Sequence, residues 1–300
     1  MITKLLVIIV KIIELEDLTK YYGDTKGTES LSFEVKKGEI FGFLGPNGAG
    51  KTTTIRTLLG FLKPTRGRAR IFGEEVGENV VELKQDIGYI PGDLNLYESM
   101  TGKEFLNYFE SLRYSSSPML ENLLKIFNLP LDKKIEGYSG GMKQKLGIIQ
   151  AFMHDPKLVI MDEPTSGLDP LVQKKFYDFL KEEKEKGRTM FFSSHILSEV
   201  EKVCDRAGII RNGELVTLEK VEKLREKRGK IVKAKIKESI EEFDGPEDME
   251  IEDGWIRFVA TDDIDKWVKK LSNYSVIDLE IKKFGLEDVF MHYYEEDRER

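Results

Sequence analysis

The strongest constraint on this chain is a glycine-rich segment set between an apolar run and a helical pattern. Ile40–Leu44 is apolar apart from one glycine, residues 45–53 read GPNGAGKTT, and Thr54–Leu59 continues as a helix. The segment matches G-x-x-x-x-G-K-S/T, whose glycines let several backbone N–H groups converge on one anion at a helix N-terminus. The pattern predicts a phosphate-binding loop, with Lys51 on the β- and γ-phosphates of a nucleotide and the Thr52 hydroxyl on Mg²⁺.

A pair of acidic residues follows a second apolar run. Leu158–Met161 reads as a strand buried on both faces of a parallel sheet, and Asp162 and Glu163 follow it directly. The carboxyl ends of such strands are where α/β proteins place ligand groups. Asp162 is therefore a candidate for Mg²⁺, and Glu163 for a general base or a residue that positions water. A strand that simply ends at the surface would look the same without the phosphate loop upstream.

A second glycine segment begins another helix. Ser139-Gly140-Gly141 precedes an apolar face made by Leu146, Ile149 and Met153. Serine is a good N-cap, and two glycines leave backbone N–H groups open to an anion. An ordinary capped helix would show the same letters, so the weight of this segment comes from its position between Lys51 and Glu163.

Composition excludes several classes of protein. The 300 residues are 40% apolar, enough for a core, and carry 47 Lys and Arg against 54 Asp and Glu, a net charge of −7. A globally basic nucleic-acid binder is disfavoured. One cysteine, Cys204, excludes an intramolecular disulfide framework and a cysteine-rich zinc site, and it fits a reduced, packed thiol.

The N-terminal run Ile2–Ile13 is the most apolar stretch of the chain. It has twelve residues, with Lys4 and Lys11 inside it, whereas a bilayer needs about 20. Acidic residues follow it in place of a signal-peptide cleavage site. A β-strand with an irregular start is preferred over a membrane anchor, and residues 1–11 could reflect a start codon assigned too early.

Charge divides the chain near Gly229. Residues 230–300 carry a net charge of −8 and residues 1–229 one of +1. Before the break, apolar strands alternate with amphipathic helices, as in an α/β sheet; residues 219–228 form a charged helical connector. After it, the pattern predicts a small α+β domain with two helices and three strands. The strands are expected at 231–237, 255–261 and 276–283. One helix would place Ile264, Trp267, Val268 and Leu271 on one face, and the last helix Leu286, Val289, Phe290 and Tyr293.

Taken together, these motifs resemble the ATP-binding subunit of ABC transporters over residues 12–220. GPNGAGKTT resembles the Walker A loop, LVIMDE the Walker B strand and YSGGM the signature loop of that family. Residues 166–169 resemble its D-loop, His195 its switch histidine and Tyr22 the aromatic residue that stacks on adenine. Tyr21 and Tyr22 adjoin each other, so both could instead be packing residues. His154 and His292 have no such context and read as ordinary core or surface residues.

The resemblance implies an α/β fold, a P-loop NTPase of the ABC type. A core sheet and a helical subdomain at about 93–155 would fill 12–220, with a connector at 221–229 and the acidic α+β domain at 230–300. It implies ATP and Mg²⁺ as cofactors, catalytic roles for Glu163, His195 and Lys51, and metal contacts from Thr52 and Asp162. The implied ATP contacts are Tyr22, Gly45, Pro46, Asn47, Gly48, Ala49, Gly50, Lys51, Thr52 and Thr53, with Ser139, Gly140, Gly141 and Asp169 completing the site in a head-to-tail dimer.

One position departs from the family pattern. The loop between the two lobes usually carries glutamine after a proline, and here Gly92 follows Pro91. Glycine has no side chain to contact Mg²⁺ or water. Either Asp93 takes over this contact, which is the working hypothesis, or the site functions without it.

The signature YSGGM and Leu286–Phe290 (LEDVF) resemble the drug-resistance branch, whose members serve a separate type-2 export permease. The expected protein is therefore a homodimeric ATPase at the cytoplasmic face of the cell membrane, peripheral to its permease, with no nucleic-acid partner. LEDVF would look the same in any amphipathic helix. A soluble ABC ATPase acting on nucleic acid or ribosomes is the alternative, and a binding-only module is a third.

Overall fold

A computed structural model describes residues 10–77, 80–113, 116–226, 230–237, 243–246, 249–252, 254–260 and 263–283. Contacts within the chain divide it into two compact units, Met1–Lys220 and Val221–Arg300, which are described separately. Within the described residues, no helix is both long enough and apolar enough to cross a membrane.

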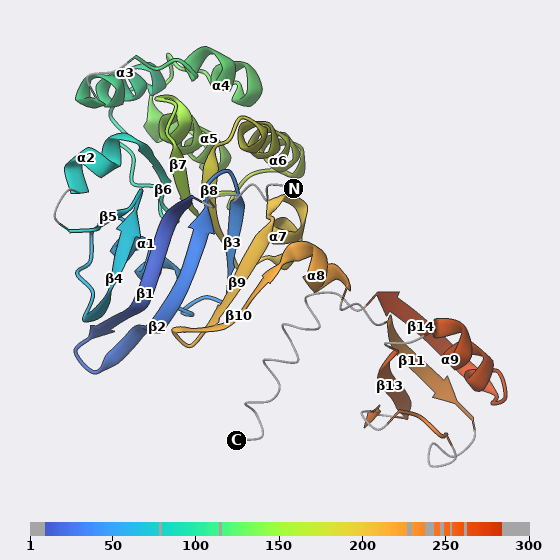
Figure 1. The fold of residues 1–300 in the computed structure, drawn as a ribbon. Helices are drawn as coiled ribbons and strands as arrows, with labels where there is room; N and C mark the ends of the chain where they lie inside the picture. The colour runs from blue at the N-terminus through green and yellow to red at the C-terminus, as the bar shows by residue number, and fades with distance from the viewer. Residues whose placement is uncertain are drawn as a thin grey trace, which may run out of the picture. The chain divides into compact units, whose positions relative to one another are not determined.

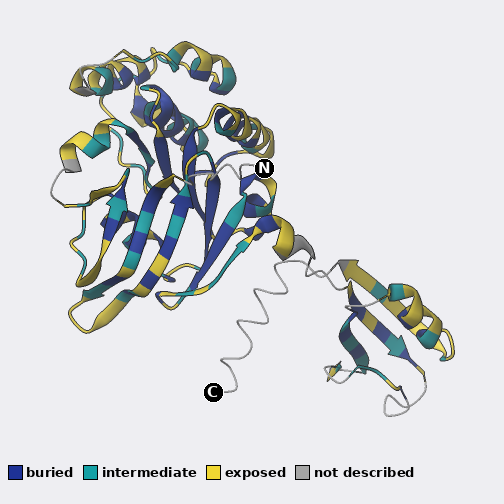
Figure 2. Cartoon of the chain, in the orientation of Figure 1, coloured by how far each residue is buried: buried dark blue, intermediate teal, exposed yellow. Residues whose placement is uncertain are grey.

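The first unit is built on a six-stranded sheet with the order β10-β9-β3-β8-β7-β6 (Figure 1). The five strands from β9 to β6 are parallel, and β10 pairs antiparallel with β9. All residues of β3, β7 and β8 are buried, as expected for strands covered on both faces (Figure 2). The strands are β3 (Ile40–Leu44), β6 (Ile87–Ile90), β7 (Leu158–Asp162), β8 (Thr189–Ser194), β9 (Arg206–Arg211) and β10 (Glu214–Lys220).

Three of the helices around the central sheet each follow one of its parallel strands, and two others lie against β6. Helix α1 contacts β7 of the central sheet and also β2 and β4 of a second sheet, while α7 contacts β3 and β8 and is joined by α6. These helices are α1 (Lys51–Leu58), α2 (Val80–Gln85), α5 (Gly140–Phe152), α6 (Pro170–Glu185) and α7 (Leu197–Val203). The predicted helix after the glycine loop is confirmed, although it begins at Lys51 itself.

The second sheet of this unit is antiparallel, with the order β2-β1-β4-β5. The alternation of strands and helices expected before Gly229 is wrong for this layer, because β1 and β2 are long strands joined directly as a hairpin. Phe33 of β2 stacks on Phe41 of β3, with ring centroids 5.2 Å apart, so the two sheets share one core. The strands are β1 (Lys11–Tyr22), β2 (Thr25–Lys36), β4 (Arg66–Ile71) and β5 (Glu74–Glu75). Of the apolar N-terminal run, residues 1–9 lie outside the described part of the chain.

A helical segment separates β6 from β7. It contains α3 (Gly102–Arg113), α4 (Leu120–Phe127), a short 3₁₀ turn at Ile135–Gly137 and α5. Both α3 and α4 lie within 93–155, the range expected for the helical subdomain. Helix α4 buries Leu123 and Phe127 and contacts α5, whose apolar face is fully buried. In Figure 1, α3 and α4 lie at the top of the unit, and α5 lies between them and the sheet.

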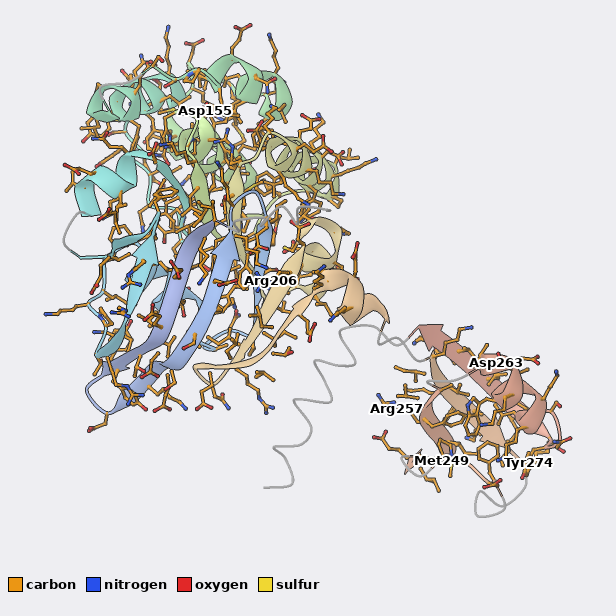
Figure 3. The ribbon with its side chains drawn as sticks, viewed as in Figure 1. Asp155, Arg206, Met249, Arg257, Asp263 and Tyr274 are labelled. Carbon is orange, nitrogen blue, oxygen red and sulfur yellow. The ribbon has the colours of Figure 1, made fainter. Side chains whose placement is uncertain are left out.

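The second unit contains an antiparallel sheet with the order β12-β13-β11-β14. Helix α9 (Ile264–Leu271) packs against it through Trp267 and Leu271, and Met249 and Tyr274 border this core (Figure 3). The predicted helix and three strands are confirmed, and β12 was not predicted. The remaining elements are α8 (Val221–Glu226), β11 (Lys230–Ile236), β12 (Glu250–Glu252), β13 (Trp255–Ala260) and β14 (Val276–Lys283).

Two details of the sequence interpretation are wrong. Val268 is 39% exposed, because α9 turns Trp267 and Leu271 to the sheet and leaves Val268 at the margin of the face. The connector helix does not begin at Glu219, since Glu219 and Lys220 pair with β9 as the last residues of β10. The predicted helix containing Leu286–Phe290 lies outside the described residues.

Candidate functional site

The phosphate-binding loop predicted from the sequence joins β3 to α1. Gly48 and Gly50 have positive φ angles of 82° and 104°, a region that other residues rarely adopt. At Gly50 a Cβ atom would lie 2.5 Å from the Gly27 carbonyl oxygen, so no larger residue fits. The loop therefore has the tight curvature by which backbone N–H groups of such loops converge on an anion.

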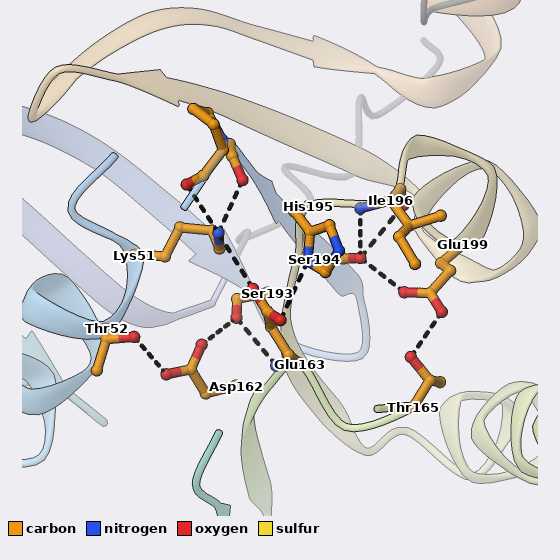
Figure 4. Close-up of polar contacts among 12 residues, drawn as sticks. Lys51, Thr52, Asp162, Glu163, Thr165, Ser193, Ser194, His195, Ile196 and Glu199 are labelled. Atoms are coloured by element: carbon orange, nitrogen blue, oxygen red, sulfur yellow. Dashed lines mark hydrogen bonds and ion pairs between the residues drawn. The ribbon is translucent and has the colours of Figure 1, made fainter. Parts of the chain in front are cut away.

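Lys51 holds this loop from inside. Its side chain is 5% exposed, and Nζ donates hydrogen bonds to the carbonyl oxygens of Gly45 at 2.7 Å and Pro46 at 3.0 Å. Nζ also lies 3.3 Å from Oε1 of Glu163 (Figure 4). A cation is thus placed at the loop where the sequence predicts phosphate groups.

Asp162, the last residue of β7, is 2% exposed and accepts hydrogen bonds from two hydroxyl groups. Thr52 Oγ1 donates to Oδ2 at 2.7 Å, and Ser193 Oγ donates to Oδ1 at 2.5 Å. The structure therefore brings together the two residues expected to bind Mg²⁺, and their hydroxyl and carboxylate oxygens are the hard ligands that this ion prefers. Burial, and then the Asp162 carboxylate, raise the pKa of nearby Tyr89 to about 12.

The loop after β6 passes beside Asp162 at Gly92. A Cβ atom on Gly92 would lie 3.5 Å from Asp162 Oδ2, so this is the position from which a side chain would reach the predicted metal site. Asp93 is exposed, one residue further along the loop.

Glu163 stands between Lys51 and His195. Its Oε2 lies 3.0 Å from His195 Nδ1, and its Oε1 faces Lys51. Its backbone N–H donates to Ser193, to the carbonyl oxygen at 3.2 Å and to Oγ at 3.3 Å. Its φ angle is +49°, a left-handed conformation that is unusual for a residue with a side chain. The side chains of Glu163 and His195 remain 26% and 45% exposed, so both face open space.

The two adjacent tyrosines at the end of β1 have different surroundings. The Tyr21 hydroxyl donates to Glu29 at 3.0 Å, whereas Tyr22 is 45% exposed. The Tyr22 hydroxyl lies 3.5 Å from Thr53 Oγ1, and Lys20 Nζ lies 5.4 Å from its ring centroid. Of the two residues, Tyr22 is the one that borders the phosphate loop and is exposed.

Ser139 and Asp169 begin neighbouring helices. Ser139 Oγ caps α5 by accepting from the Met142 N–H at 3.3 Å, which confirms the predicted N-cap. Asp169 caps α6 by accepting from Leu171 and Val172, both at 3.0 Å. At Gly141 a Cβ atom would lie 2.9 Å from the Gly167 carbonyl oxygen, so the two segments pack closely. The hydrogen bonds described for Ser139 and Asp169 are made within these two segments, and none of them reaches Lys51.

Sequence reasoning missed a second buried carboxylate next to the site. Glu199 of α7 is 4% exposed and accepts from Thr165, Tyr177 and Ser194. A signal was present, because Glu199 lies among Leu197, Val200 and Val203 on the buried side of a short helix. Glu199 and its three partners are scattered over 35 positions of the chain, so no local motif joins them.

Comparison with known proteins agrees with this geometry. The family model described as ABC transporter matches residues 28–166, and an AAA domain model matches residues 133–201. The bacitracin transport ATP-binding protein BcrA of Bacillus licheniformis is 45% identical over 209 residues, 68% of each chain. BcrA of Enterococcus faecalis is 39% identical over 82% of this chain and 83% of its own. The linearmycin resistance ATP-binding protein LnrL of Bacillus subtilis is 37% identical over 69% and 68%.

Solved structures agree as well. The solved structure of an ATP-binding subunit of an ABC transporter superposes with a TM-score of 0.67 at 34% identity, over 71% of this chain and 92% of that one. A dimeric ATP-binding cassette bound to ADP and phosphate, at 24% identity and a TM-score of 0.65, has the same fold. Fold and site together define a P-loop ATPase that binds ATP. Within that class, the chain belongs to the ATP-binding proteins of the ABC transporter family.

Proposed function

We propose that this ATPase powers export through a separate membrane permease, docked at the cytoplasmic face of the membrane. Two named relatives, BcrA and LnrL, are a bacitracin transport and a linearmycin resistance protein, which supports the export direction. The observation that carries the ATPase role is the cluster in which Glu163 lies between Lys51 and His195, beside the pair Thr52 and Asp162. We assign the ATP-binding domain to residues 12–220, with its helical subdomain at 93–155.

In this proposal, the phosphates of ATP lie on the loop from Gly45 to Thr53. The backbone N–H groups and Lys51 bind them, with Lys51 exchanging the Gly45 and Pro46 carbonyls for phosphate oxygens. Tyr22, which is 45% exposed, stacks on the adenine. Thr52 and Asp162 would hold Mg²⁺, and this ion would neutralise charge on the phosphates.

Glu163 and His195 act on the attacking water. The Glu163 carboxylate accepts a hydrogen bond from the water and polarises it, while His195 keeps that water in line with the γ-phosphate. The left-handed backbone of Glu163 directs its side chain from the end of a buried strand to the open space shared with Lys51 and His195. Positioning and charge neutralisation supply most of the rate in phosphoryl transfer.

ATP closes two copies of the chain head to tail. Ser139, Gly140, Gly141 and Asp169 of one copy complete the site formed by the phosphate loop of the other. The packing of Gly141 against Gly167 supports this arrangement, because it joins the signature segment to the Asp169 loop as one unit within a copy. The closed state is favoured because it makes contacts with the γ-phosphate that the open state lacks.

Asp93 is proposed to contact Mg²⁺ or its water in place of the glutamine that the family usually carries at position 92. The short distance of 3.5 Å from a Cβ atom at Gly92 to Asp162 Oδ2 supports a contact from this loop. Asp93→Ala should lower ATPase activity at limiting Mg²⁺; unchanged activity would leave this loop without a metal contact.

The test of the main proposal is Glu163→Gln. Turnover should fall by about 10²-fold or more, because the general base is lost, while ATP still binds. Gel filtration with Mg-ATP should show a stable dimer, and Lys51→Ala, the binding-deficient control, should stay monomeric and lose ATP affinity. Turnover that persists in Glu163→Gln would refute the assigned base.

The permease is tested with the same variant. Tagged Glu163→Gln protein with ATP should recover a polytopic membrane protein from gently solubilised native membranes, as read by mass spectrometry. Recovery of ribosomal or DNA-bound proteins without a membrane partner would instead favour a soluble ABC ATPase.

A further inference from the structure

Glu199 is a buried carboxylate that the proposed mechanism does not use. Its Oε1 accepts from Thr165 Oγ1 at 2.6 Å and from the Tyr177 hydroxyl at 3.1 Å, and its Oε2 accepts from Ser194 Oγ at 2.6 Å. Three donors on two oxygens suit an ionised carboxylate, which only accepts hydrogen bonds. Burial, and then the Glu199 carboxylate, raise the pKa of the Tyr177 hydroxyl, which therefore stays a donor at neutral pH.

Two of these hydroxyls belong to residues that adjoin the site. Ser194 directly precedes His195, and its Oγ also accepts from the Ile196 N–H at 2.9 Å, so the backbone is held on both sides of His195 (Figure 4). Thr165 lies two residues after Glu163, in the loop that leads to Asp169. Glu199 is thus the common partner of the chain around His195 and the chain after Glu163.

The loop after Glu163 is also tied to α5. The Gln144 side chain, 6% exposed, donates to the Pro164 carbonyl oxygen at 2.7 Å. A continuous path of hydrogen bonds and covalent chain therefore runs from α5 through Pro164, Thr165 and Glu199 to Ser194. Every side-chain hydrogen bond on this path is buried.

We propose that Glu199 is a positioning residue that fixes His195 relative to Glu163 and transmits movement of loop 164–169 to His195. The inference rests on the proposed function, because it takes His195 and Glu163 to be the groups that act on water. Glu199 itself contacts neither side chain through the hydrogen bonds described, and it acts through Ser194 and Thr165.

The substitution Glu199→Gln tests this role with little change of volume. An amide has one acceptor oxygen and one NH₂ donor, so it cannot accept from both Thr165 and Ser194 through different oxygens. Ser194 Oγ already accepts from Ile196, and an NH₂ group facing it would force this hydroxyl to reorient. The change therefore disturbs the segment that carries His195.

Glu183→Gln is the matched control. Glu183 is also a fully buried glutamate, but its partners are Arg188 and Lys186 rather than hydroxyl groups beside the site. Glu199→Gln should lower kcat about tenfold or more at unchanged KM for ATP, since small displacements of catalytic groups have large effects. Glu183→Gln should lower the melting temperature and leave kcat unchanged.

Ser194→Ala should reproduce the loss of kcat. In the double variant with Glu199→Gln the two losses should not add, because both changes break one interaction. If Glu199→Gln fails to fold, Ser194→Ala carries the test. Additive losses, or wild-type kcat in either folded variant, would overturn the proposal.

Imidazole NMR gives a readout that does not depend on turnover. The His195 ring signals, identified by their loss in His195→Asn, should shift in Glu199→Gln and stay in place in Glu183→Gln. Unshifted His195 signals in a folded Glu199→Gln protein would refute the positioning role. Turnover that survives Glu163→Gln would instead refute the proposed function, so the two failures are distinguishable.

Discussion

The two ends of the six-stranded sheet satisfy their buried carboxylates in opposite ways. Near the amino ends of the strands, Glu183 pairs with Arg188 at 2.7 Å, and Arg188 also reaches Asp155. Glu39 pairs with Arg206 at 3.0 Å, at the starts of β3 and β9; Asp155 and Arg206 are labelled in Figure 3. Each buried acid at this end is neutralised by a guanidinium group.

At the carboxyl ends, hydroxyl groups replace the guanidinium groups. Asp162 accepts from Thr52 and Ser193, and Glu199 accepts from three hydroxyls. Hydroxyl donors satisfy the hydrogen-bonding capacity of a carboxylate but leave its negative charge in place. One end of the sheet is therefore electrostatically neutralised, while the other keeps negative charge available for a cation.

Removing Arg188 should have the largest effect. Arg188→Ala leaves Glu183 buried without its main cation, and breaking such a pair lowers the free energy of unfolding by about 3–5 kcal/mol. Urea unfolding measures the loss, and ATPase activity per folded molecule should stay at the wild-type level. Arg188→Met with Glu183→Leu should restore much of the stability. A fall in activity per folded molecule would contradict the purely structural role given to the amino end of the sheet.

Asp162→Asn tests the other end. Its amide can accept from only one of the two hydroxyls and no longer attracts Mg²⁺, so ATPase activity should fall by about 10²–10³-fold. The melting temperature should change little, because the side-chain volume remains and the amide NH₂ can donate to the second hydroxyl oxygen. Activity titrated against Mg²⁺ and a thermal melt measure both quantities. A large loss of stability with activity retained would reverse the roles given to the two ends.

A substitution at Cys204 should have the smallest effect. Its thiol is influenced by charged groups near both ends of the sheet. Burial, followed by the charges of Asp205 and Glu199, raises the pKa of its thiol well above the ordinary value of 9.0. Because the folded pKa is the higher one, the thiol favours the folded state below pH 9, and this contribution is lost as pH rises further. Compared with Cys204→Ala, the wild type should therefore lose more stability between about pH 8 and about pH 10. Equal pH dependence of the two proteins would contradict this shift.

The sequence predicted the parts of the site that local patterns encode. GPNGAGKTT between an apolar run and a helix required a strand, a loop and a helix in that order, and Leu158–Asp162 required a buried strand. The antiparallel layer was missed because Lys11–Tyr22 mixes buried and exposed residues without strict alternation, and its bulges shift the register. Val268 was misplaced because helical spacing does not fix the edge of a buried face.

The Glu199 network could not be predicted in the same way. Thr165, Tyr177, Ser194 and Glu199 come from a loop, two helices and the end of a strand. Ordinary residue types at irregular spacing meet only after α6 and α7 have packed against the sheet. The cluster forms only in the tertiary structure, so no sequence motif indicates it.

The left-handed backbone at Glu163 limits how this protein can be improved. A residue with a side chain in that conformation costs about 1 kcal/mol or more, and glycine would relieve the cost. Pro164 follows, which disfavours the ordinary helical conformation at Glu163 and helps to lock the turn. Selection for thermostability alone would therefore favour glycine at this position and remove the proposed base. The φ angle of Glu163 thus sets stability against activity.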